Sequence, residues 1–311
     1  MTLRPNRLYL LWLEMLWTVI AGCSEPARQV VSRQLSARPP GPTFRVRAGY
    51  VPRELRESSG VAVSRQHNGI LWSHNDSRNE NLLFATSLGG ELRGTFRVAG
   101  ATNRDWEDIA LAPCPGEPGD CLYIGDTGDN GRNRKDVAIY VVPEPSPRQG
   151  DASEIRETAP AVRWTVRYDD GPEDVEALAV TLDGTVLLVT KGRHGPIRLY
   201  AVKPEEVHDG QPTTARLVRE MDIAPIRLLG RWVTGAAISP NGRRMVIRTY
   251  TELFFYQFDA AGRLTLTGDC FLGAQEPQGE GVDFLDDETL VLTSEAVLGR
   301  RGPITVVRCS P

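Results

Sequence analysis

From residue 44 onward, short apolar segments alternate with turns rich in Gly, Asn, Asp and Pro, and helical periodicity is almost absent. One short pattern recurs: a polar residue, then a small residue or Asp, then alternating apolar and mostly small residues. Its five copies begin at Ser59, Glu107, Glu176, Thr234 and Glu280, at intervals of 48, 69, 58 and 46 residues. This recurrence predicts a repeat architecture.

A similar series of predicted strands follows each copy. The second strands are 70–73, 122–125, 186–189, 245–248 and 290–293; the third are 82–85, 138–141, 197–200, 254–257 and 304–307; the fourth lie near 95–98, 163–167, 216–221 and 267–272. Four strands in each unit of about 45 residues are typical of a β-propeller blade.

The last repeat ends after three strands, and residues 44–50 are expected to supply the fourth. Closing the ring with strands from both ends of the domain removes an exposed sheet edge. The sequence therefore predicts an all-β fold over residues 44–311, a β-propeller of about five four-stranded blades closed by an N-terminal strand. A β-sandwich is the alternative, although such regular repeats are unusual in sandwiches.

The N-terminal segment has the pattern of a secretory signal. Arg4 and Arg7 precede a mostly apolar run over 8–20, and the small residues Ala21 and Gly22 lead into Cys23. The ending 20–23 resembles the bacterial lipobox, which implies cleavage after residue 22 and acylation of Cys23. The alternative is an ordinary cleaved signal with an incidental cysteine. Residues 23–43, rich in proline, are expected to be a flexible tether.

Cysteine usage agrees with export. Apart from Cys23, the chain has Cys114, Cys121, Cys270 and Cys309, an even number suited to disulfides in an oxidising compartment. A turn-forming insert between Cys114 and Cys121 favours a bridge between these two, which leaves Cys270 for Cys309. The spacing alone leaves the other pairings open.

The net charge of the chain bears on whether its partner is a nucleic acid. Removing residues 1–22 takes away two arginines and one glutamate, so the formal charge moves from −4 to −5. This balance disfavours nucleic-acid binding, which normally requires a basic face. We expect an exported monomer, held on a membrane by its lipid anchor and facing the periplasm or the cell exterior.

Acidic residues recur at the starts of the predicted first strands and at the ends of the second strands. The positions two before each copy are Glu57, Asp105, Asp174, Trp232 and Gln278, and they share a strand face with the polar residue that begins the copy. The second-strand ends carry His74, Asn75 and Asp76; Asp126, Asp129 and Asn130; Lys191, Arg193 and His194; Arg248 and Tyr250; and Ser294 and Glu295. In a propeller both sets open on one face, so we expect them to meet at the mouth of the central channel.

Crowded carboxylates need a counter-charge. Two of them about 5 Å apart repel by ~3 kcal/mol at an effective dielectric near 20, and hard oxygen ligands suit Ca²⁺. The sequence predicts a Ca²⁺ site at Asp105, Glu107, Asp126 and Asp129, and ligand-binding residues at Glu57, Asp76, Glu176, Tyr250 and Glu295. The alternative is a structural role, in which the acids bond to backbone amides or pair with arginines.

Several stretches carry a family resemblance: 57–62, 105–110, 125–130 and 278–280. They resemble those of a largely uncharacterised family of bacterial exported propellers, over most of residues 54–300. The chain is more distantly similar to calcium-dependent propeller phytases and to phytase-related, esterase-like propellers. This resemblance implies a carboxylate-bound calcium on the channel face. Segment 125–131 resembles part of an EF-hand loop, but Val137, followed by Ala138, stands where that loop needs its distal glutamate.

Two functions are compatible with these residues. One is a cell-envelope binding protein that recognises a small molecule or an envelope protein at the channel mouth. The other is a metal-dependent hydrolase of phosphoesters or lactones. In the hydrolase, Glu107 or Glu280 would act as base, Lys191 or Arg248 would stabilise negative charge, and His74 or His194 would serve in acid–base steps. Nucleophile-elbow and phosphate-loop motifs are absent.

Overall fold

The computed structural model describes residues 40–147, 152 and 154–310. The predicted signal (1–22), the predicted acylation site Cys23 and most of the predicted tether (23–43) lie outside these residues. Within the described part, no helix has the length and apolar character needed to cross a bilayer.

Nearly all regular structure in the described residues is β-strand. Chain order and bounds are β1 Phe44–Tyr50, β2 Ser58–Val63, β3 Ile70–Asn75, β4 Leu82–Ser87, β5 Leu92–Arg97, β6 Trp106–Pro113, β7 Asp120–Asp126, β8 Val137–Pro143, β9 Ile155–Glu157, β10 Val162–Tyr168, β11 Val175–Val180, β12 Val186–Thr190, β13 Arg198–Val202, β14 Thr213–Glu220, β15 Val233–Ile238, β16 Arg244–Thr249, β17 Glu252–Phe258, β18 Leu264–Phe271, β19 Gly279–Phe284, β20 Thr289–Ser294 and β21 Pro303–Arg308. Two short 3₁₀ turns, η1 Pro204–Glu206 and η2 Arg227–Leu229, lie in loops.

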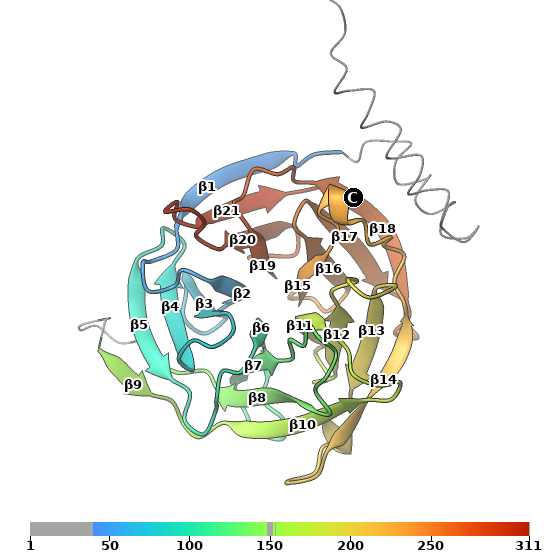
Figure 1. The fold of residues 1–311 in the computed structure, drawn as a ribbon. Coiled ribbons are helices and arrows are strands. Elements are labelled where there is room, and N and C mark those ends of the chain that lie inside the picture. Colours follow the sequence, from blue (N-terminus) through green and yellow to red (C-terminus); the bar gives the residue numbers. More distant parts are fainter. Residues whose placement is uncertain (1–39, 148–151, 153, 311) are drawn as a thin grey trace, which may run out of the picture.

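The strands form four sheets arranged around an axis in a propeller-like fold (Figure 1). Their orders are β2-β3-β4-β5-β9, β6-β7-β8-β10-β14-β13-β12-β11, β15-β16-β17-β18, and β19-β20-β21-β1. The eight-stranded sheet consists of two antiparallel sets joined at their outer strands, where β10 pairs in parallel with β14. The all-β fold and its propeller-like character are confirmed. The short strand β9, which extends the first sheet beside β5, was not predicted.

Strands β2, β6, β11, β15 and β19 lie innermost, and each contacts the next around the axis (Figure 1). The first of them, β2, also contacts the last, β19. At the rim, β1 pairs antiparallel with β21, from Phe44 opposite Arg308 to Tyr50 opposite Pro303. Segments from the two ends of the described chain therefore share one sheet.

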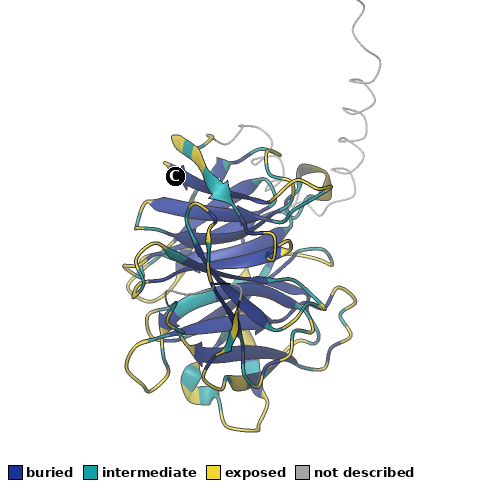
Figure 2. Ribbon diagram, turned by 90° about the vertical axis from the view of Figure 1, so that its left-hand side faces the viewer, coloured by how far each residue is buried: buried dark blue, intermediate teal, exposed yellow. Residues whose placement is uncertain are grey.

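Five hydrophobic clusters fill the spaces between neighbouring sets of strands. One contains Trp72 on β3 and Trp106 on β6, and another contains Leu71 on β3 and Val291 on β20. The remaining three lie between the other successive sets. Figure 2 shows the result: the strands are buried, while the exposed residues lie mostly in loops. This burial supplies most of the driving force for folding and holds the inner strands rigidly.

Each innermost strand has an irregular register at the polar residue of the repeat. The shifts fall between 58 and 61, 106 and 108, 175 and 177, 233 and 235, and 279 and 282. A β-bulge leaves a residue unpaired and redirects its side chain. The residues within these shifts include Ser59, Glu107, Glu176, Thr234 and Glu280, the first residue of every copy.

Close approach between inner strands explains the small residues that follow. A Cβ on Gly60 would lie 2.6 Å from Ile109 N, and one on Gly281 would lie 2.8 Å from Val61 N. Hydrogen bonds tie the same neighbours: Ser59 Oγ donates to Glu107 O at 2.5 Å and Thr234 Oγ1 donates to Glu280 O at 3.2 Å. The repeat therefore encodes tight packing around the axis.

The described residues contain two disulfides, Cys114–Cys121 and Cys270–Cys309. The first closes a short hairpin loop over a separation of 7 residues. The second spans 39 residues and joins β18 to the segment after β21, so it links two sheets. Both bridges agree with the predicted disulfides.

Removing the Cys270–Cys309 bridge is expected to lower the free energy of unfolding by about 2–4 kcal/mol. The reason is that it constrains a longer loop of the unfolded chain and links separate sheets. Urea unfolding of Cys270→Ala/Cys309→Ala measures this, with Cys114→Ala/Cys121→Ala as the matched control. The control should lose less stability. An equal or larger loss in the control would contradict the prediction.

Candidate functional site

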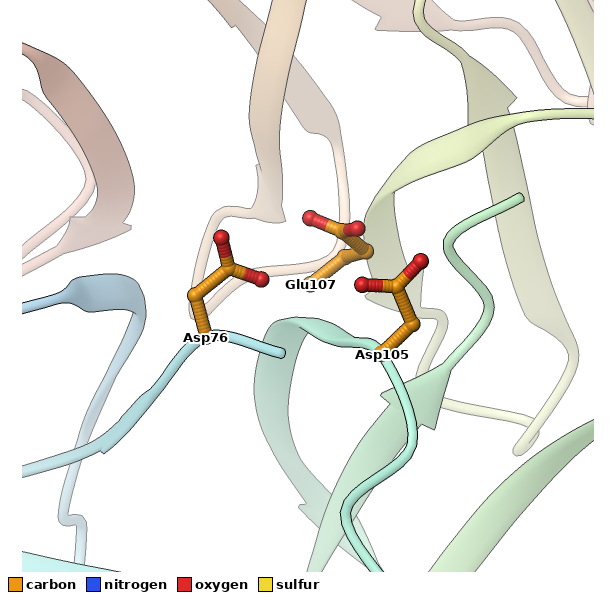
Figure 3. Close-up of side chains that lie close together, drawn as sticks. All are labelled: Asp76, Asp105 and Glu107. Carbon is orange, nitrogen blue, oxygen red and sulfur yellow. The ribbon is translucent and has the colours of Figure 1, made fainter. Parts of the chain in front are cut away.

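The inner-strand bulges and the loops after the second strands bring the predicted acids together. Three carboxylates, Asp76, Asp105 and Glu107, each place one oxygen within 4.8 Å of the other two (Figure 3). Asp76 follows β3, Asp105 immediately precedes β6, and Glu107 is the bulge residue of β6. Two successive inner sets of strands therefore supply the three side chains, here called the carboxylate triad.

Further acids and one lysine surround the carboxylate triad. Lys191 Nζ lies 2.6 Å from Glu176 Oε2, and both side chains are buried. Gln278 Nε2 donates to Glu280 Oε1 at 3.0 Å and to Glu295 Oε1 at 2.8 Å. Electrostatic coupling connects these residues with the triad and with Tyr250. The set Asp76, Asp105, Glu107, Glu176, Lys191, Tyr250, Glu280 and Glu295 is called the mouth cluster below.

Negative charge is in excess in this cluster. Burial, together with the Glu176 and Asp76 carboxylates, raises the pKa of Glu107 well above its usual range. Burial and the Asp76 carboxylate raise the pKa of Asp105 to about 6. Although burial opposes it, the Glu176 carboxylate raises the pKa of Lys191, which therefore stays charged. One buried lysine does not neutralise so many acids, so the folded chain favours extra protons or a cation here.

The carboxylates of Asp105 and Glu107 receive no hydrogen bond from the part of the chain that the structure describes. Asp126 and Asp129, the other two predicted metal ligands, are engaged elsewhere. Arg134 Nη1 lies 2.9 Å from Asp126 Oδ1, and Arg134 N donates to Asp129 Oδ2 at 2.6 Å. Asp126 and Asp129 therefore fit the alternative structural role, in which acids pair with arginines or accept hydrogen bonds from backbone amides. Their role as ligands of a metal ion stays a prediction.

Because Gly128 has no side chain, the triad carboxylates have room beside its backbone. A Cβ at this position would lie 2.6 Å from Asp105 Oδ2 and would overlap Glu107 Oε1. Two buried oxygens near the triad have no hydrogen-bond partner among the described residues: Glu176 Oε1 and Asp174 Oδ2. Unpaired buried carboxylate oxygens are costly, so the local geometry suits a cation ligated by oxygen.

Other predicted residues lie apart from the carboxylate triad or are occupied. Arg248 is fully buried, and its Nη1 donates to Gly281 O at 2.5 Å and Thr293 O at 2.9 Å, while its Nη2 pairs with Glu276. Glu57 is exposed and accepts a hydrogen bond from Asn79. His74 is buried edge-on against Trp106, and exposed His194 contacts Asn130 O at 3.0 Å.

No family model matches the chain, and no curated protein is similar to it. Among solved structures it is similar to hydrazine synthase of Kuenenia stuttgartiensis (12% identity, TM-score 0.40, 85% of this chain and 66% of that chain). It is also similar to a gluconolactonase from Xanthomonas campestris (12%, 0.41, 88% and 95%) and to a glucose dehydrogenase (12%, 0.46, 86% and 100%). The chain thus spans slightly less than two thirds of the hydrazine synthase chain.

These likenesses carry no correspondence between residues, so the function rests on the geometry of the mouth cluster. The resemblance to exported and phytase-like propellers stays a prediction. Sequence reasoning placed Asp76 among the ligand-binding residues and overlooked its approach to Asp105 and Glu107. The available signal was its position, because it directly follows a second strand in the same way that Asp126 ends one.

The mouth cluster predicts how stability depends on pH. Burial raises the pKa of Glu176 to about 7, with Lys191 opposing, and burial and Asp76 raise the pKa of Glu295 to about 7. In the unfolded chain both groups have their ordinary value of 4.5. The folded state therefore binds more protons above pH 4.5, and the stability that this gives is lost as pH rises through the folded pKa of about 7.

We expect the melting temperature of the chelator-treated protein to fall by several degrees from about pH 6.5 to pH 8. Burial lowers the pKa of His74 to about 4, so its opposing contribution acts below this range. Calorimetry across these pH values measures the effect, and Glu295→Gln should reduce it. A constant or rising melting temperature would contradict the assignment.

Proposed function

We propose that this protein binds a divalent cation, Ca²⁺, through Asp76, Asp105 and Glu107, and uses it to hold a ligand at the mouth of a five-bladed propeller. In this proposal the two halves of the eight-stranded sheet are separate blades, and β1 completes the last blade. The observation that carries the proposal is the carboxylate triad itself: two of its three carboxylates have no protein donor in the described residues, and a nearby Glu176 oxygen is buried without a partner.

The size of the carboxylate triad suits the ion. Oxygens that share one Ca²⁺ at 2.3–2.6 Å lie at most about 5.2 Å apart, and the three oxygens here lie within 4.8 Å. Without a cation, each pair of carboxylates at that separation repels by about 3.5 kcal/mol at an effective dielectric near 20. Three carboxylates do not fill the six to eight positions of Ca²⁺. The remaining positions would accept water or an oxygen of the ligand.

Export and membrane anchoring complete the proposal. Two disulfides suit an oxidising compartment, and the lipobox-like segment ending at Cys23 supplies the anchor. We place the protein as a monomeric lipoprotein of the cell envelope, with its ligand a small molecule or an envelope protein.

Titration of the chelator-treated protein with Ca²⁺, followed by calorimetry, tests the cation site. We expect binding of one ion and a rise in melting temperature that grows with Ca²⁺ concentration. Asp105→Asn should weaken binding about tenfold or more, whereas Asp209→Asn, on an exposed loop, should leave it unchanged. Absence of both heat and stabilisation in the unmodified protein would refute the proposal.

A metal-dependent hydrolase is the second candidate, favoured by the Glu176–Lys191 pair. Burial raises the pKa of Glu176 to about 7, near the value that suits a general base at neutral pH. Lys191 Nζ, 2.6 Å from Glu176, is positioned to stabilise negative charge. Turnover of p-nitrophenyl phosphate, phytate or simple lactones that requires Ca²⁺ and is lost in Glu176→Gln would support catalysis. No turnover would leave the binding function.

A further inference from the structure

Beside the mouth cluster, an open cleft of about 560 Å³ is lined by Gly192, Arg193, Pro225, Arg227 and Trp232. Its first lining residue, Gly192, directly follows Lys191, and Val233 N donates to Lys191 O at 3.1 Å, which joins the two walls. Trp232 occupies the position two before the bulge residue, where the two neighbouring repeats carry Asp174 and Gln278. The cleft therefore borders the proposed cation site.

Two guanidinium groups share the single indole ring of Trp232. Arg193 Cζ lies 5.2 Å from the ring centroid and Arg227 Cζ lies 5.4 Å from it. A ring face attracts cations and holds them in place. Neither guanidinium forms an ion pair with a carboxylate of the described residues, whereas Arg132, Arg134 and Arg198 nearby all do.

Hydrogen bonding leaves Arg193 with spare donors. Its Nη1 donates to Asn130 Oδ1, but its Nε is buried and has no acceptor among the described residues. A buried donor without an acceptor is costly. Arg227 is exposed and faces the same cleft. Positive charge therefore lies on the wall of a cleft that, among the described residues, no acidic side chain lines.

The walls of the cleft are held in place before any ligand arrives. Arg231, next to Trp232, forms a buried bidentate pair with Glu252, with Nη2 to Oε1 at 2.7 Å. On the other wall, a Cβ at Gly192 would lie 2.9 Å from Pro225 Cβ, so the glycine allows the two loops to touch. Such preorganisation lowers the cost of ordering the arginines on binding.

We propose that Arg193 and Arg227, supported by Trp232, form an anion-binding subsite for a small organic ligand that carries a phosphate or carboxylate group. Guanidinium groups bind both kinds of oxyanion with paired, charge-assisted hydrogen bonds. The inference deepens the proposed function, since a second part of the same ligand would reach the cation at the carboxylate triad. The mouth is thus bipolar, with acids on one side and, on the other, two arginines that form no ion pair within the described part of the chain.

Calorimetric titration of the full chain, with and without Ca²⁺, tests the subsite. The probes are glucose 6-phosphate, glucuronate and glucose, which share a ring and differ in the charged group, together with inorganic phosphate. We expect at least one of the anionic probes to bind and glucose to show no measurable binding. A preference for glucose 6-phosphate would identify phosphate as the recognised group, and a preference for glucuronate would identify carboxylate.

Arg193→Gln/Arg227→Gln should weaken binding of the anions about 10-fold to 100-fold and leave Ca²⁺ affinity within about threefold. Arg263→Gln is the matched control, because Arg263 is 81% exposed and pairs with Asp259 in a turn. Melting temperatures verify that the variants are folded. Trp232→Phe should retain much of the binding, since a ring remains.

The subsite is refuted if a protein that binds Ca²⁺ binds none of the anions, or if the double variant binds them as tightly as the unmodified chain. If the anions bind and depend on both arginines while Ca²⁺ does not bind, the subsite stands and the proposed cation site fails. The two proposals therefore fail on different measurements.

Discussion

Gly128→Ala is expected to weaken Ca²⁺ binding by about 100-fold or more. The added methyl group would lie 2.6 Å from Asp105 Oδ2 and would overlap Glu107 Oε1, so both carboxylates have to leave the positions shown in Figure 3. Gly128 does not have a positive φ, so alanine is compatible with its backbone. The substitution removes no charge and no ligand atom, and its effect reports on geometry alone.

Calorimetric titration and the melting temperature in Ca²⁺ and in chelator measure this effect. Gly195→Ala is the matched control, because its Cβ would meet no atom within 4 Å. The control should bind Ca²⁺ as the unmodified protein does. If Gly128→Ala stays folded in chelator and still binds Ca²⁺ within about threefold of the original affinity, the carboxylate triad is not the cation site.

Strand positions were largely predictable because propeller strands are short and their side chains alternate. The predicted segments 70–73, 122–125 and 290–293 fall within β3, β7 and β20. Segment 44–50 coincides with β1 and pairs with β21. The bounds of the outer strands were predicted less accurately: the predicted range 216–221 corresponds to β14, which runs over Thr213–Glu220. Half-exposed rim strands alternate less clearly between apolar and polar residues.

The repeat pattern predicted that the acidic residues meet at the axis. It did not predict which side chains pair with each acid. Glu107, Glu176 and Glu280 are buried in one electrostatically coupled cluster, as strand starts around an axis require. The choice of Asp76 in place of Asp126 depends on Arg134, which reaches back across the loop after β7 to pair with Asp126. The path of such a loop and its side-chain rotamers leave no periodic signal in a single sequence.

The β-bulges also could not be predicted from the alternation of apolar and polar residues along the strands. Alternation predicts on which face of the sheet a side chain lies, but a bulge inserts one extra residue. The side chains after the bulge therefore point to the opposite face from the one that simple alternation predicts. The five polar residues that begin the repeats lie at those bulges. The sequence shows that these residues recur, but it does not show that a bulge is the reason. Two copies also contain an aspartate, Asp108 and Asp283. Both carboxylates accept backbone hydrogen bonds from other inner strands, Asp108 from Leu178 N and Asp283 from Val63 N.

Asp108→Ala is expected to lower the free energy of unfolding by about 2–6 kcal/mol. Asp108 Oδ2 accepts Leu178 N at 2.9 Å and Ala236 N at 3.1 Å, and Oδ1 accepts Ile109 N at 2.9 Å. Its carboxyl group thus ties β6 to β11 and β15. Alanine leaves Leu178 N and Ala236 N without an acceptor, at about 1–3 kcal/mol for each buried donor. Burial raises the pKa of Asp108 well above its usual range, so the loss is partly offset by the removal of a poorly solvated acid.

Urea unfolding in chelator separates this effect from cation binding. Asp108→Asn should lose less stability, because one amide oxygen can still accept from Leu178 N and Ala236 N. Asp209→Ala, at an exposed position, should change stability by less than about 0.5 kcal/mol. Since Asp108 directly follows Glu107, loosening the contacts of β6 should also reduce Ca²⁺ affinity, and Asp108→Asn should show an intermediate loss. A fall in stability below about 1 kcal/mol for Asp108→Ala would mean that these hydrogen bonds do not hold the inner strands together.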